Sequence, residues 1–90
     1  MTTFVIITPP SNPDMPKFVA AMDRVFPNAA YRVVDAGQFL AVKKDATSQQ
    51  ITNELGPNGE VGKFVVFTSA GHWGWHDKTL WEWLTVKGAT

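Results

Sequence analysis

The stretch Tyr31-Arg32-Val33-Val34-Asp35-Ala36-Gly37-Gln38-Phe39-Leu40-Ala41-Val42 decides the fold, because it holds two apolar runs separated by turn residues. Both runs are rich in β-branched and aromatic residues, which favour strands. Gly37 can adopt positive φ in the turn between them. Two strands joined by so short a turn pair as an antiparallel hairpin, so the middle of the chain predicts strands over 31–34 and 39–42.

A strand and a helix are expected before this hairpin. The run Phe4-Val5-Ile6-Ile7 is continuously apolar and ends at two prolines, which predicts a strand buried on both faces near the sheet centre. Asn12 is then a candidate helix cap, with Pro13 at the first helical position and Asp14 in the first turn. Apolar residues follow at helical spacing until Pro27-Asn28 ends the helix: Met15, Phe18, Val19, Met22, Val25 and Phe26.

A second helix and strand are expected after the hairpin. Thr47 with Gln50 three residues later matches a capping box, and Gly56 followed by a proline is placed to end the helix. Its apolar face is thin, with Ile51 and Leu55 one turn apart, so we expect it to cover the sheet loosely. Residues 63–67 predict a fourth strand.

The chain ends with a predicted third helix over about 78–86. Asp77 could cap it, and Leu80, Trp83 and Leu84 would form its inner face.

This order of elements predicts an α+β, ferredoxin-like β-α-β-β-α-β fold with an added C-terminal helix and a four-stranded antiparallel sheet. Right-handed crossovers place strands one and three in the middle, and both helices on one face. The whole chain, residues 1–90, is expected to be a single domain. The terminal helix or a second copy of the protein could cover the other face.

Composition narrows the function classes. Eight basic and eight acidic residues give a net charge of zero, which argues against a strongly charge-driven nucleic-acid binder. The chain has no cysteine, so thiolate catalysis, disulfides and thiolate metal sites are excluded. We expect a cytoplasmic protein without a signal peptide, because no basic region precedes the first apolar run and no apolar stretch is long enough to span a bilayer.

The loop before the last helix, His72-Trp73-Gly74-Trp75-His76, carries candidates for a ligand or interface. Trp73 and Trp75 face the same side in an extended chain, where they could stack on a ligand ring or pack against a dimer partner. Packing is the favoured reading. His72 and His76 with Asp77 could ligate a metal only on a helix, which the glycines disfavour, so we expect no metal and no cofactor.

Basic residues gather in one place in the sequence. Lys43 and Lys44, with Arg32 on the neighbouring predicted strand, are candidate contacts for nucleic acid. The alternative is a solvated hairpin end, where lysine at a strand edge blocks unwanted pairing.

In its length, its element order and its C-terminal sequence, the chain resembles the Cas2-like group of small proteins that includes the SinR family. The ending reads Phe64-Val65-Val66-Phe67, Gly71-His72-Trp73-Gly74 and Leu80-Trp81-Glu82-Trp83-Leu84. The resemblance implies a homodimer packed through the sheets and, for Cas2 itself, a metal-dependent nuclease or a DNA-holding scaffold.

The nuclease of that family relies on an acidic residue at the end of strand one. Here the matching place reads Ile7-Thr8-Pro9-Pro10, and Asp14 is the first carboxylate after it. No catalytic residue is therefore carried over. Asp14, Asp35 or Asp45 could approach this place from loops.

The sequence therefore favours a small non-catalytic binding or assembly module, homodimeric and not bound to a membrane. One alternative is a Cas2-like nucleic-acid-binding protein or nuclease. The other is a small ligand binder or enzyme that uses the loop from His72 to His76.

Overall fold

The computed structural model describes residues 2–69, which form an α+β fold with four strands and two helices. In chain order these are β1 (Thr2–Ile7), α1 (Met15–Val25), β2 (Tyr31–Asp35), β3 (Gln38–Lys43), α2 (Ser48–Leu55) and β4 (Val65–Ser69). The predicted third helix and the tryptophan-rich loop lie outside the described residues.

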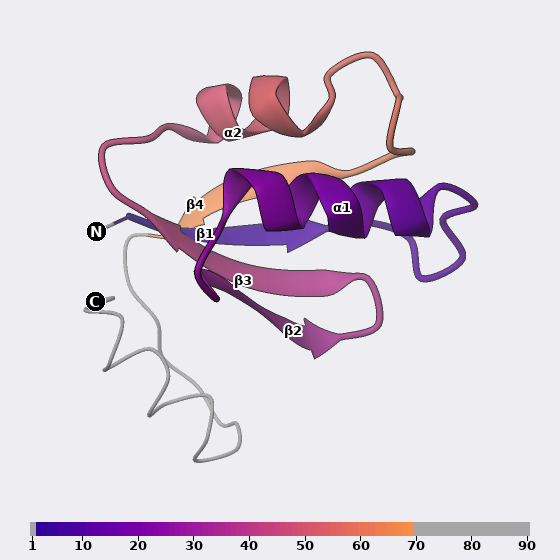
Figure 1. Ribbon diagram of the computed structural model, residues 1–90, viewed down its shortest axis with the longest axis horizontal. Helices are drawn as coiled ribbons and strands as arrows, with labels where there is room; N and C mark the ends of the chain where they lie inside the picture. Colours follow the sequence, from indigo (N-terminus) through magenta and orange to yellow (C-terminus); the bar gives the residue numbers. More distant parts are fainter. Residues whose placement is uncertain (1, 70–90) are drawn as a thin grey trace.

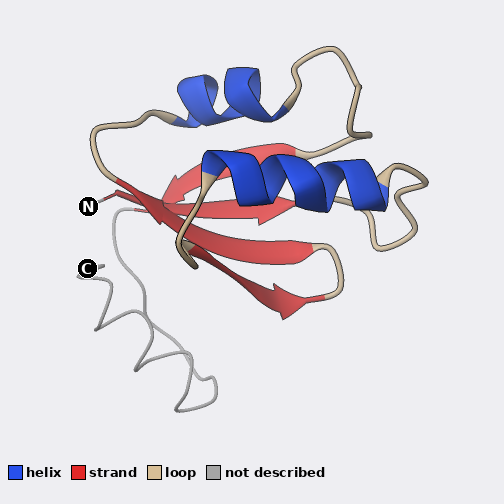
Figure 2. Ribbon diagram, in the orientation of Figure 1, coloured by secondary structure: helices blue, strands red, loops and turns tan. Residues whose placement is uncertain are grey.

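The four strands form one sheet in the order β2-β3-β1-β4, with every neighbouring pair antiparallel. The first and third strands lie in the middle and the second and fourth at the edges, as the sequence predicted. Both helices lie on the same face of this sheet (Figure 1), and the colouring by secondary structure makes the two layers plain (Figure 2).

The core fills the space between the helices and the sheet. Phe4 and Ile6 of β1 are fully buried, and both lie on the face that the helices cover. The Phe18 ring of α1 lies 5.3 Å from the Phe39 ring of β3 and 5.7 Å from the Phe64 ring, measured between centroids. Tilted aromatic pairs of this kind contribute about 0.5–1.5 kcal/mol each beyond their buried area.

The start of α1 differs from the prediction. Asn12 does not cap the helix; Asp14 occupies the cap position, and its side chain makes no capping hydrogen bond. Asn12 is instead buried, because its amide is needed between two loops: it donates to the Thr8 hydroxyl and to the Val61 carbonyl, each at 2.9 Å.

The second helix begins as predicted, with the capping box of Thr47 and Gln50, and Gly56 lies at its C-cap. The expected loose cover is wrong, because both residues of its thin apolar face, Ile51 and Leu55, are buried in the common core.

Two details of the strands also differ. β1 is buried on both faces only in part, since on its second face Thr3 is buried whereas Ile7 is 38% exposed. β4 begins at Val65 rather than Lys63, because the Lys63 carbonyl accepts a hydrogen bond from the Thr8 hydroxyl at 2.6 Å instead of pairing with β1.

Candidate association surface

The sheet face opposite the helices carries apolar side chains. Successive residues of a strand point to opposite faces, so the burial of Phe4 and Ile6 under the helices places Val5 and Ile7 on this helix-free face. Val5 pairs with Leu40 on one side and with Phe67 on the other, and Ile7 pairs with Val65. The apolar set therefore runs across β3, β1 and β4.

Three neighbouring members of this set are exposed: Ile7 by 38%, Val65 by 45% and Phe67 by 52%. We call these three residues the β4 patch. Scattered exposed apolar residues are normal on a protein surface, whereas adjacent ones mark places where another surface binds. The β4 patch is thus suited to apolar contact.

The two edges of the sheet differ in character. β2 carries Arg32 and Asp35, and its pairing with β3 shifts register between Val33 and Asp35. Charges and irregular pairing are devices that keep edge strands from pairing with other chains. β4 reads Val65-Val66-Phe67-Thr68-Ser69 and contains no charge and no proline, so it lacks these protections.

A shallow hollow of about 390 Å³ adjoins the β4 patch at the end where β4 begins. Among residues 2–69, Lys63 is the only charged residue that lines it. The lining residues are Ile7, Thr8, Pro9, Pro10, Ala36, Gln38, Lys63, Phe64 and Val65.

The walls of this hollow are held by hydrogen bonds that sequence reasoning missed. The Thr8 backbone N–H donates to the Gly37 carbonyl at 2.8 Å, while its hydroxyl donates to the Lys63 carbonyl. Asn12 then ties Thr8 to Val61. Three segments far apart in sequence are thereby fixed at one end of the sheet. The signal for Thr8 is slight, since a threonine after a strand is common.

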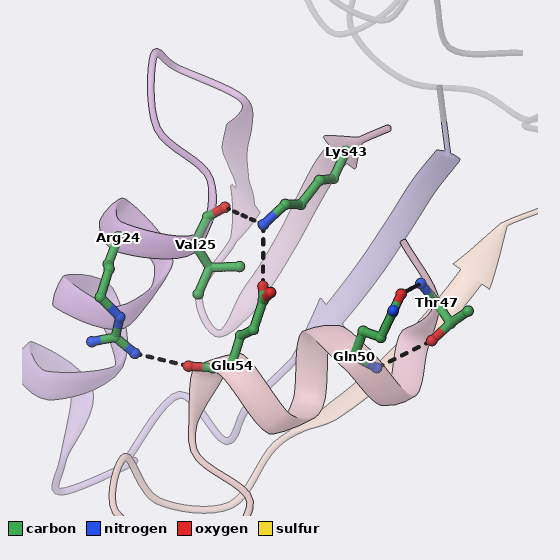
Figure 3. Close-up of polar contacts among 6 residues, drawn as sticks. All are labelled: Arg24, Val25, Lys43, Thr47, Gln50 and Glu54. Atoms are coloured by element: carbon green, nitrogen blue, oxygen red, sulfur yellow. Dashed lines mark hydrogen bonds and ion pairs between the residues drawn. The ribbon is translucent and has the colours of Figure 1, made fainter. Parts of the chain in front are cut away.

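Lys43 is engaged in structural contacts. Its ammonium lies 3.1 Å from the Glu54 carboxylate and 3.2 Å from the Val25 carbonyl (Figure 3), and 6.0 Å from the Phe26 ring centroid. Glu54 also accepts a hydrogen bond from Arg24 through its backbone carbonyl. Because both ion-pair side chains are partly exposed, the pair contributes less than about 1 kcal/mol. Its clearer role is to tie β3 to both helices.

The other basic candidates are placed differently. Arg32 pairs with Leu40 and so lies on the helix-free face, opposite to the face from which Lys43 reaches the helices. Lys44 is exposed just after β3. The structure therefore does not gather Arg32 and Lys43 on one face, and nucleic-acid contact by these residues stays a prediction.

Two groups within residues 2–69 have clearly shifted pKa values, and neither belongs to the β4 patch. Partial burial, together with the hydrogen bond that its hydroxyl donates to Asp23, raises the pKa of Tyr31 to about 12. The backbone N–H of Glu60 itself, helped by that of Asn58, holds the pKa of the Glu60 carboxyl below its usual range.

The remaining sequence candidates, His72, Trp73, Trp75 and His76, lie outside the described residues. Within residues 2–69 no group of three or more histidines or carboxylates comes together in a way that could hold a metal ion. Neither described helix is long and apolar enough to cross a membrane.

The fold and surface define a small α+β domain in which, among residues 2–69, the helix-free face buries Thr3 and Val42 and exposes the β4 patch. Comparison with protein-family models, curated proteins and solved structures finds no match.

Proposed function

We propose that this protein is a non-catalytic assembly module, a ferredoxin-like domain that forms a homodimer through the β4 patch. The strand order β2-β3-β1-β4 and the two helices on one face support the ferredoxin-like class. The observation that carries the function is the exposure of Ile7, Val65 and Phe67 as neighbours on the helix-free face. The Cas2-like resemblance also implies a homodimer.

Apolar contact is what this surface offers. Burying exposed apolar area contributes roughly 25 cal/mol per Å², and aromatic side chains are enriched in the centres of interfaces. Phe67 is the one aromatic residue of the β4 patch, so it is the expected anchor of the contact.

The test compares the oligomeric state of the wild type, Phe67→Lys and Val33→Lys by light scattering behind size exclusion. Val33 is a control of similar exposure, 57% against 52% for Phe67, that lies on the other edge strand and on the helix side of the sheet. We expect dimers for the wild type and for Val33→Lys at about 100 µM, a concentration at which micromolar affinity saturates. Phe67→Lys should be a folded monomer with an unchanged circular dichroism spectrum.

A wild type that is monomeric at that concentration would overturn the proposal. So would a Phe67→Lys variant that keeps its fold and remains a dimer.

A further inference from the structure

We infer that β4 is the strand by which two copies join, pairing antiparallel with β4 of the second copy about a two-fold axis at Phe67. This inference rests on the proposed function and adds to it the element, the register and the hydrogen bonds of the dimer. The two sheets would then form one continuous sheet with both β4 strands at its centre.

The direction of the backbone groups follows from the register of the sheet. The Thr8 N–H donates to the Gly37 carbonyl, so Thr8 and every second residue before it, including Ile6 and Phe4, point their backbone groups toward β3. The residues between them, Val5 and Ile7 among them, point toward β4.

The same alternation fixes which β4 groups have no strand partner among residues 2–69. Val65 and Phe67 lie opposite Ile7 and Val5, so their backbone groups face β1. The N–H and C=O groups of Val66 and Thr68 therefore point away from β1, along the open edge. An edge strand with such groups is a template for pairing.

This row of groups is complementary to itself. When two β4 strands run antiparallel with Phe67 opposite Phe67 of the second copy, Val66 lies opposite Thr68 of that copy. Both residues of this pair present N–H and C=O groups, so the pair forms two hydrogen bonds, and symmetry repeats them. No charged residue lies on β4, so the pairing brings no like charges together.

In this arrangement Phe67 of one copy lies directly opposite Phe67 of the other, at the kind of position where side chains on paired strands approach most closely. A pair without its own backbone hydrogen bonds has Cα atoms about 4.5 Å apart, closer than in a hydrogen-bonded pair. Both rings lie on the helix-free face, where they can contact each other and the β4 patch of either copy. The exposed aromatic residue and the open edge thus serve one contact.

The β2 edge does not offer the same match. Val33 is more exposed than Phe67, but its strand carries Arg32 and Asp35, and the register shift beside Val33 interrupts regular pairing. Because of this contrast, β2 serves as the internal control for pairing at the β4 edge.

Cysteine cross-linking tests the register directly, because the protein contains no cysteine of its own. We expect Phe67→Cys to form a covalent dimer under mild oxidation at least about tenfold faster than Val33→Cys, since Cα atoms within about 4.4–6.8 Å suit a disulfide. Val65→Cys should also cross-link slowly, because Val65 would lie opposite Ser69 of the second copy.

Amide hydrogen exchange in the unaltered wild type supplies a second measurement that needs no substitution. The Val66 and Thr68 amides should exchange freely in dilute protein and become protected, by about tenfold or more, as the dimer forms. The Tyr31 and Val33 amides, which point outward from β2 by the same alternation, should not change with concentration.

The outcomes separate this inference from the function on which it rests. A dimer in light scattering, with slow cross-linking at position 67 and no concentration-dependent protection of Val66 and Thr68, would overturn edge pairing and leave assembly through the face intact. Protection at every concentration would mean that residues 70–90 of the same chain cover the edge, which also overturns it. A wild type that never dimerises overturns both.

Discussion

At the scale of single residues, one contact decides how the loops around the hollow fit together. Gly62 has φ of +88° and packs directly on the buried Asn12 amide, which holds Thr8 and Val61. A Cβ atom at position 62 would lie 2.2 Å from Asn12 Oδ1, far inside contact distance. The glycine is therefore needed for a backbone conformation and also for a close approach.

We expect Gly62→Ala to lower the free energy of unfolding by more than Gly59→Ala does. Both positions have positive φ, so both variants carry a backbone cost of about 1–2 kcal/mol. Gly59 has no atom within 4 Å of its Cβ position, whereas Gly62→Ala also disrupts Asn12, adding about 1–3 kcal/mol for unsatisfied buried groups. Urea unfolding of both variants measures the difference, and equal losses would show that the Asn12 contact is unimportant.

Tyr31 predicts a pH dependence at the residue scale. Its pKa is about 12 in the folded protein against 10.0 for a free tyrosine, so folding favours the protonated phenol. That stabilisation is fully present below pH 10 and is lost as the pH rises through about 12. Solvent screening makes the loss small, because Tyr31 is only partly buried and its hydrogen bond to Asp23 lies at the surface.

The measurement is the free energy of unfolding of the wild type minus that of Tyr31→Phe across this alkaline range. We expect the difference to fall as the pH rises, since the variant cannot ionise. A difference that stays constant would contradict the raised pKa.

At the scale of elements, the capping box decides where α2 begins. The Thr47 hydroxyl accepts a hydrogen bond from the Gln50 N–H at 3.2 Å, and the Gln50 side chain accepts one from the Thr47 N–H at 2.8 Å. A helix of only eight residues has few backbone hydrogen bonds to stabilise it. Most of its stability therefore comes from the capping of its first turn and from its packing on the core.

We expect Thr47→Ala to lower the free energy of unfolding by about 1 kcal/mol, because the Gln50 N–H loses the hydroxyl that accepts its hydrogen bond. Thr52→Ala is the matched control, since its hydroxyl bonds only to the Ser48 carbonyl inside the helix and its removal should cost less than about 0.5 kcal/mol. Thr47→Ser should restore wild-type stability in thermal unfolding. An equal loss in the two alanine variants would count against the capping role.

At the scale of the whole molecule, the tryptophan-rich loop and the β4 patch are two candidate regions for one association. The sequence predicts that Trp73 and Trp75 pack against a partner. We expect the double change Trp73→Ala with Trp75→Ala to weaken the dimer measured by light scattering while leaving the fold of residues 2–69 intact. If the variant keeps both its fold and its oligomeric state, the rings are free to bind a ligand, and a nucleotide screen would follow.

The element order of residues 2–69, the hairpin, the capping box and the central position of β1 were all predictable from the sequence. Each depends on local signals: apolar runs of strand length, helical spacing, and turn or cap residues at fixed offsets. The α1 apolar face was found in the same way, and Phe18, Met22, Val25 and Phe26 are buried.

The remaining features depended on contacts between distant segments. Asn12 reads locally as a helix cap, and its Oδ1 does accept a hydrogen bond from the Asp14 N–H, but its Nδ2 group donates to Thr8 and Val61, and these contacts exist only once two loops meet. Lys43 reads as a free cation, but α1 and α2 bring it a carbonyl and a carboxylate. Likewise, the element order already placed β4 at an edge of the sheet, while only the assembled sheet showed that Phe67 is exposed there. Short-range signals thus determined the elements, and tertiary packing decided which polar groups were engaged and which apolar surface stayed open.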